Sequence, residues 1–135
     1  MVYVLDTNTI IHYLRDNQTV INNLEAAVEN DDNIVIPYVV DYEIRRGYEV
    51  KPAPSKEAHY DILSKRIDFC TVVSMGDGFW STAAKIYAEI YGKRLTVGEN
   101  DIQIAAFTVY NGYTLVTNDS DYQNITGLQL VDWTI

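Results

Sequence analysis

Cysteine is nearly absent from this sequence, which limits both its fold and its compartment. Cys70 is the only cysteine among 135 residues, so no disulfide framework can form. Neither Cys70 nor the two histidines, His12 and His59, have the spacing of a zinc site. The neighbours of Cys70 are mostly apolar, which is typical of a small buried residue in a reducing compartment. We therefore expect a cytoplasmic protein.

Long apolar runs are missing too. No segment approaches the roughly 20 apolar residues that a membrane-spanning helix needs. The N-terminal sequence MVYVLD has neither the basic residues nor the apolar stretch of a secretory signal. With 47% hydrophobic and 21% charged residues, the composition is that of a globular protein. The length predicts a single domain over residues 1–135. From the missing apolar runs we expect no contact with a membrane.

Positive charge is scarce as well. Ten Lys and Arg stand against nineteen Asp and Glu, which gives a net charge of −9. A nucleic-acid-binding protein usually has a basic surface, and this chain lacks one overall. The cations are unevenly spread, since six of the ten lie between positions 45 and 66: Arg45, Arg46, Lys51, Lys56, Lys65 and Arg66. This segment is either a solvated pair of helices or a contact for a phosphate backbone.

Short apolar strands alternate with amphipathic helices along the whole chain. Strands are predicted at Val2–Leu5, Ile34–Ile36, Phe69–Val73, Tyr113–Thr117 and Leu128–Val131. Helices are predicted after Asp6, at Gln18–Glu29, from a first turn at Pro37, at Ser55–Arg66, from Asp77 to Ile90, and at Asp101–Tyr110 after a cap at Asn100. This order predicts an α/β fold whose mostly parallel sheet is covered by helices on both faces.

Acidic residues follow the strands at the places where such folds carry their functional groups. Asp6 comes directly after the first strand, and Asp119 and Asp121 follow the fourth. Glu43 lies about two turns into the helix after the second strand, and Asp101 begins the helix that leads to the fourth. The carboxyl ends of parallel strands meet at one edge of the sheet, so these acids can face one crevice.

A cluster of carboxylates needs a cation, because like charges repel and burial penalises them further. Mg²⁺ binds oxygen ligands, usually one or two carboxylates and several waters. Such an ion activates water and neutralises charge on an attacked phosphate. An acidic protein can therefore act on RNA through metal ions rather than through lysines.

Each acid also has a purely structural interpretation. Asp6 could cap the first helix, although any residue of Thr7–Thr9 could do so as well. Asp101 could be a favourable charge at a helix N-terminus, and Glu43 a solvated helix residue. The two acids after the fourth strand could be turn residues. The joint pattern of the acids is therefore more informative than any one of them.

That pattern resembles a known family. The segments VLDTNTIIHYL, VVDYEIRRG, NDIQIAA and LVTNDSDY look like the four acidic blocks of PIN-domain nucleases, most closely the VapC-type toxins of toxin–antitoxin pairs. The resemblance spans Val4 to about Val131. It implies a three-layer α/β/α sandwich around a five-stranded, mostly parallel sheet. It also implies an endoribonuclease dependent on Mg²⁺ or Mn²⁺, an RNA substrate, a cognate antitoxin and a homodimer.

Matched block by block, the resemblance implies roles for individual residues. Asp6, Glu43, Asp101 and Asp119 would be catalytic. The metal would be held by Asp6, Asp101 and Asp119, whereas Glu43 would hold a second metal or steer the attacking water. Asp121 could replace Asp119 as the fourth acid.

Residues beside these acids would orient carboxylates and water: Thr7, Asn8, Thr117 and Asp121. Tyr122 stands where the family more often has Phe, and is expected to matter only to packing.

Two other interpretations remain open. A phosphoryl-transfer domain could use Asp6 as a nucleophile near Mg²⁺, but such sites generally need a lysine after a late strand, and the segment Thr117–Tyr122 has none. A degenerate PIN-type module could bind a partner without catalysis, but here all four acidic positions are filled.

Overall fold

The computed structural model describes residues 1–66 and 69–135. Its centre is a sheet of five short strands: β1 (Val2–Leu5), β2 (Asn33–Pro37), β3 (Cys70–Val73), β4 (Thr114–Val116) and β5 (Gln129–Val131). Their order is β3-β2-β1-β4-β5, and every neighbouring pair is parallel. The α/β class and the parallel sheet predicted from the sequence are confirmed.

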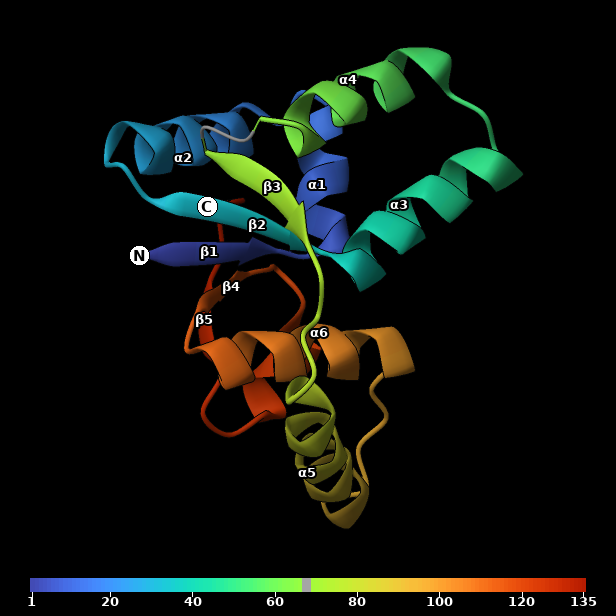
Figure 1. Ribbon diagram of the computed structural model, residues 1–135, viewed down its shortest axis with the longest axis vertical. Helices are drawn as coiled ribbons and strands as arrows, with labels where there is room; N and C mark the ends of the chain where they lie inside the picture. Colours follow the sequence, from blue (N-terminus) through green and yellow to red (C-terminus); the bar gives the residue numbers. More distant parts are fainter. Residues whose placement is uncertain (67–68) are drawn as a thin grey trace.

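Helices connect the strands: α1 (Thr7–Leu14), α2 (Gln18–Glu29), α3 (Tyr38–Val50), α4 (Pro54–Ser64), α5 (Phe79–Gly92) and α6 (Glu99–Asn111). Figure 1 shows α1 to α4 in the upper half of the molecule and α5 and α6 in the lower half, with the strands between them. A short 3₁₀ helix, η1 (Ser120–Asn124), lies between β4 and β5 where the sequence suggested only a turn. The helices in the described ranges are all too short or too polar to cross a lipid bilayer.

Several helix starts differ by a few residues from the sequence prediction. Pro37 is the last residue of β2 rather than part of a helical turn, because it still pairs with Val73 of β3. Helix α6 begins at Glu99 rather than at Asp101, since the carbonyl of Gly98 accepts the first helical bond, from Ile102 N–H at 3.0 Å. Asp77 lies before α5, which begins at Phe79. These shifts are small, but they move Asp101 from the edge of α6 into its first turn.

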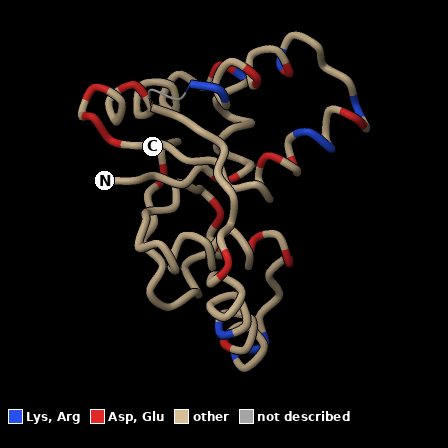
Figure 2. The backbone as a smooth tube through the Cα atoms, viewed as in Figure 1, with Lys and Arg blue, Asp and Glu red and all other residues tan. Residues whose placement is uncertain are grey.

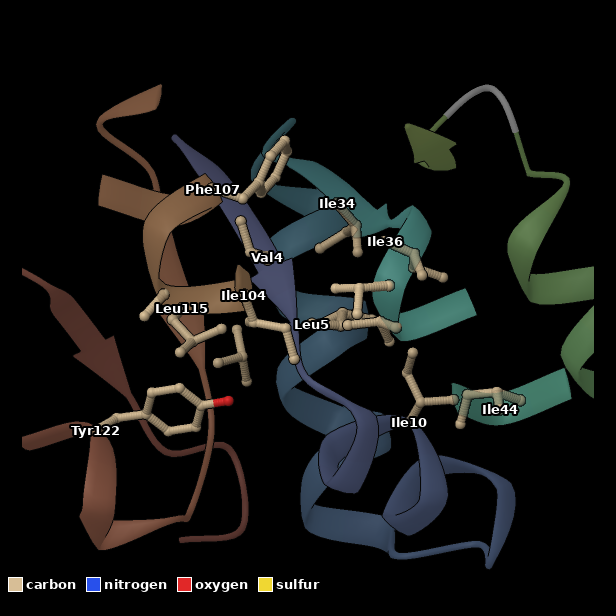
Figure 3. Close-up of a cluster of buried hydrophobic side chains, with 14 of the residues drawn as sticks. Val4, Leu5, Ile10, Ile34, Ile36, Ile44, Ile104, Phe107, Leu115 and Tyr122 are labelled. Carbon is tan, nitrogen blue, oxygen red and sulfur yellow. The ribbon is translucent and has the colours of Figure 1, made fainter. Parts of the chain in front are cut away.

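The core forms where the strands meet the helices. Figure 3 shows side chains from β1, β2 and β4 packed with others from α1, α3, α6 and η1. The labelled members are Val4, Leu5, Ile10, Ile34, Ile36, Ile44, Ile104, Phe107, Leu115 and Tyr122, all at most 5% exposed. Cys70 is also fully buried, as its apolar neighbours predicted.

The strand order creates a switch point beside β1. From β1 the chain moves outward through β2 to β3, then returns to the other side of β1 as β4 and continues to β5. Ligands of open parallel sheets bind beyond the carboxyl ends of strands at such a point. β1 and β4 end side by side, since the register pairs Leu5 with Val116. The residues after these two strands therefore lie where a ligand of such a sheet would bind.

Candidate active site

Asp6 is the first residue after β1, and hydrogen bonds hold both its backbone N–H and its carboxylate. Its backbone N–H donates to the carbonyl of Val116 at 3.3 Å, which continues the pairing with β4. Its carboxylate Oδ1 accepts the Thr9 N–H at 2.8 Å, so Asp6 itself is the N-cap of α1. The sequence left the cap open between Asp6 and Thr7–Thr9, and the structure assigns it to Asp6, which still has extended backbone and places its carboxylate over the free amides of the first turn. The side chain is buried, with 3% of the residue exposed.

Asp101 lies in the first turn of α6 and is half-buried. The hydroxyl of Tyr122 in η1 donates to its Oδ1 at 3.0 Å. Tyr122 is itself 1% exposed, so its ring packs in the core while its hydroxyl reaches the acid. The expectation that Tyr122 matters only to packing was therefore wrong. A phenylalanine could fill the same space but could not donate this bond.

Glu43 extends from α3 toward the N-terminal turn of α1. The Thr7 hydroxyl is near enough to favour the charged form of Glu43. Even so, neither Oε1 of Glu43 nor Oγ1 of Thr7 meets the geometry of a hydrogen bond with any described residue, although both atoms are buried. Arg46 approaches Oε2 of Glu43 at 3.9 Å, at the outer limit of an ion pair. The site therefore holds two buried polar atoms for which residues 1–66 and 69–135 provide no hydrogen-bond partner of suitable geometry.

The loop after β4 brings the late acids to the same place. Asp119 donates its N–H to Oγ1 of Thr117 at 3.0 Å and accepts the Asp121 N–H on Oδ1 at 2.9 Å. Asp119 is half-buried, whereas Asp121 is exposed. Both raise the pKa of Asp101, and Asp119 has the larger effect. This difference supports Asp119 as the fourth acid of the cluster.

Burial and mutual repulsion together perturb three of these acids. The pKa of Asp6, of Glu43 and of Asp101 is raised in each case, primarily because burial disfavours the charged form. Repulsion adds to this, since Asp101 acts on both Asp6 and Glu43. Hydrogen bonding opposes it, because the hydroxyl of Thr117 lowers the pKa of Asp6. The structure thus brings the predicted acids together at the switch point, and such perturbed acids are common at functional sites.

The oxygen donors present suit a hard divalent ion. No three acidic, histidine or cysteine side chains within residues 1–66 and 69–135 are arranged so that they could bind one ion. Mg²⁺ does not need three, because it usually binds one or two carboxylates and retains several waters. The repelling carboxylates and the unpartnered Oε1 of Glu43 are the features that such an ion and its waters would satisfy.

The predicted orienting residues differ in their surroundings. Thr117 contacts the backbone of Asp119, and Thr7 lies beside Glu43, so both stand next to catalytic candidates. The Asn8 side chain is exposed and has no hydrogen bond with another residue of the described chain, so its role stays a prediction.

A pocket of about 300 Å³ lies against the Glu43 side of the cluster. Thr7 and Glu43 form part of its wall, and α1, α3 and the start of α4 enclose it. Sequence reasoning missed this pocket. Its one visible signal is the spacing of Ile11 and Leu14 on α1, which also fits an ordinary core face.

Comparisons with known proteins agree with this arrangement. The family described as PIN domain matches residues 3–128. Ribonuclease VapC2 of Rickettsia felis is 27% identical over 136 residues and is covered over 98% of each chain. Ribonuclease VapC1 of Haemophilus influenzae strain R2866 is 24% identical over 139 residues, with 99% of each chain covered.

Solved structures have the same fold. The crystal structure of VapBC2 from Rickettsia felis bound to promoter DNA includes a chain with a TM-score of 0.89 and 27% identity, covering 98% of this chain and 99% of that one. VapBC-1 from nontypeable Haemophilus influenzae gives a TM-score of 0.85 at 23% identity over the full length of both chains. The family match spans nearly all of the sequence and covers the acids described above and the strands up to β4, whereas β5 lies just beyond its end. The resemblance seen in the four acidic segments is therefore confirmed, and the chain belongs to the PIN domain family.

Proposed function

We propose that this protein is a metal-dependent endoribonuclease that acts as the toxin of a toxin–antitoxin pair. The observation that carries the proposal is the meeting of Asp6, Glu43 and Asp101 at the switch point, each with a raised pKa. Full-length relatives named as ribonucleases support RNA as the substrate. Related structures described as VapBC complexes support an antitoxin partner.

The proposed role of each acid follows from its position. Asp6 and Asp101 would hold Mg²⁺ or Mn²⁺, with Asp119 as a further or water-mediated ligand. When bound, the ion supplies activation of water and neutralisation of charge on the phosphate. Capping of α1 through Oδ1 holds the Asp6 carboxylate in place before any ligand arrives. In the same way, the bond from Tyr122 orients Asp101.

Glu43 would steer the attacking water or take part in holding a second ion. Its burial raises its pKa, which makes the carboxylate a better acceptor for a proton. Its Oε1 has no hydrogen-bond donor among the described residues, so it can accept one from water. In-line attack of that water on phosphorus would form one P–O bond and break the opposite one, with the proton of the water passing to the Glu43 carboxylate and the departing RNA oxygen taking a proton from solvent.

The proposed partners and location of the protein rest on the same relatives. A cognate antitoxin that covers the acidic crevice, a homodimer and a cytoplasmic location are all part of the proposal. A toxin of this kind should arrest growth when it is expressed without its antitoxin.

Cleavage of RNA by purified protein tests the proposal. Wild type should cut RNA in Mg²⁺ or Mn²⁺ and stop in EDTA, and Asp101→Asn should lose the activity because one carboxylate of the cluster is gone. Glu99→Gln is the matched control, since Glu99 is an exposed acid in the same turn of α6. Equal cleavage by Asp101→Asn and wild type would contradict the proposed site.

A further inference from the structure

The pocket beside Glu43 is built from residues on single faces of two helices. From α1 come Thr7, Ile11, Leu14 and the adjoining Arg15, and from α3 come Glu43, Ile44, Gly47, Tyr48 and the adjoining Lys51. Pro52, Ala53 and Lys56 close the end between α3 and α4. The helical spacing of these positions makes a continuous wall that starts at the acids and runs away from them along both helices. A ligand in the pocket would therefore touch the acidic cluster at one end.

The far part of this wall is positively charged. Arg15, Lys51 and Lys56 are all exposed, and none forms an ion pair with another residue in the described part of the chain. Arg45 differs, because it is paired with Asp41 at 3.1 Å and with Asp61 at 3.2 Å. In a chain with ten cations and a net charge of −9, three unpaired cations at one pocket are a local exception.

Positively charged residues are confined to a few parts of the fold. Lys and Arg positions gather on α3, on α4 and on the connection between them, and again at the far end of α5 (Figure 2). Only the first group adjoins both the pocket and Glu43.

The floor of the pocket is apolar, and an aromatic residue stands in its wall. Leu14 and Ile44 are buried beneath it, and Tyr48 is half-buried in its wall. At Gly47 a Cβ atom would meet nothing within 4 Å, so the wall is open there. A volume of about 300 Å³ is at the lower end of the range for small-ligand pockets. An apolar floor, an aromatic residue in the wall and a cationic rim match a nucleobase that carries a phosphate.

We propose that this pocket binds one unpaired nucleotide of the RNA, directly adjacent to the phosphate that is cut. The inference rests on the proposed ribonuclease function and adds the place where the strand is held. The base lies on the apolar floor beside Tyr48, and Lys51, Lys56 and Arg15 contact the phosphates leading away from Glu43. A duplex would not present a free base to this pocket, so the substrate is single-stranded at the cut.

Two substitutions test the pocket on the Asp6→Asn background, where RNA should bind without being cut. Gly47→Leu places a side chain in the open wall and suits a helix better than glycine does, so the fold is kept. Lys51→Gln removes one cation, and Lys85→Gln is the matched control on the exposed surface of α5. Binding of a short fluorescein-labelled single-stranded RNA of mixed sequence is measured by anisotropy over a range of salt concentrations.

Gly47→Leu should weaken RNA binding about tenfold, the effect of losing one stacked base. Lys51→Gln should reduce the slope of log K against log salt by about 0.7, which corresponds to one phosphate contact on a single strand. Lys85→Gln should change neither quantity. If both pocket variants bind RNA as the control does, the pocket is not a nucleotide site, even where the Asp101→Asn result supports the ribonuclease. If they keep RNA binding but lose binding of the cognate antitoxin, the pocket belongs to a protein ligand and the proposal is overturned.

Discussion

At the scale of single residues, Asp6 combines two roles that the sequence presented as alternatives. Its Oδ1 caps α1, and its burial at the end of β1 places the same carboxylate in the acidic cluster. The sequence placed Asp6 directly after the first strand, as observed, but could not assign the cap, because Thr7–Thr9 are equally good caps by composition. Because β1 ends at Leu5, Asp6 is the residue that precedes the first turn of α1 and caps it.

Two substitutions of Asp6 should separate the two roles. In EDTA at neutral pH, Asp6→Asn should be more stable than wild type, because asparagine also caps a helix and removes a buried, repelled charge. Asp6→Ala should be about 1 kcal/mol less stable than Asp6→Asn, because it also loses the cap. Urea unfolding of the three proteins measures both differences. If Asp6→Ala and Asp6→Asn unfold together, Asp6 does not cap the helix in solution.

The gain from Asp6→Asn should depend on pH with a definite sign. The pKa of Asp6 is raised above its ordinary 3.8, so the folded state binds this proton more tightly than the unfolded chain. Stability contributed by this group is therefore greatest below 3.8 and falls as the pH rises through the folded pKa. Thus the advantage of Asp6→Asn should shrink as the pH is lowered through that window. An advantage that grows on acidification would contradict the raised pKa.

At the scale of elements, two of the acids lie within helices, and the spacing of those helices made their positions predictable. The positions of Glu43 on α3 and of Asp101 in α6 follow from helical periodicity and from the strands on either side. What could not be predicted is the contact of Tyr122 with Asp101, because it depends on a 3₁₀ helix that the sequence TNDSDY does not distinguish from a turn. The pocket could not be predicted for a similar reason, because it depends on how α1, α3 and the start of α4 pack against one another.

Two glycines should respond in opposite directions because their elements use them differently. Gly47 lies inside α3 with free space around it, so Gly47→Ala should raise stability by about 0.8 kcal/mol. Gly112 ends α6 with φ at 69°, a left-handed conformation that alanine adopts poorly, so Gly112→Ala should lower stability by about 1 kcal/mol. Thermal unfolding of both variants gives the comparison. A loss of stability in Gly47→Ala would mean that α3 does not continue through residue 47.

At the scale of the whole molecule, the order of strands explains how an acidic chain can have a defined active site. The switch point beside β1 collects acids from four separate stretches of sequence, whereas the cations of the pocket come from the end of α1 and from the α3–α4 segment. The sequence predicted the sheet because its strands are short, apolar and regularly spaced. It could not place the two charged regions relative to each other, because that depends on packing between distant elements.

Metal should stabilise the whole fold, since it relieves repulsion among buried carboxylates. At about 100 times its dissociation constant, Mn²⁺ should add roughly 2.7 kcal/mol to the free energy of unfolding. Asp101→Asn should lose most of this gain, and Glu99→Gln should keep it. A melting temperature that is the same in Mn²⁺, Mg²⁺ and EDTA would count against a metal site.

The central claim is that the acids at the switch point bind a metal that is used to cut RNA. Its most direct test is to measure the rate of RNA cleavage by wild type and by Asp6→Asn as a function of Mn²⁺ concentration. Wild type should show no cleavage without Mn²⁺ and a saturable rise as Mn²⁺ is added. Asp6→Asn should remain inactive at Mn²⁺ concentrations that saturate wild type, although it is folded and stable in the same buffer. Cleavage by Asp6→Asn at the wild-type rate, or cleavage by wild type that is unaffected by EDTA, would contradict the account.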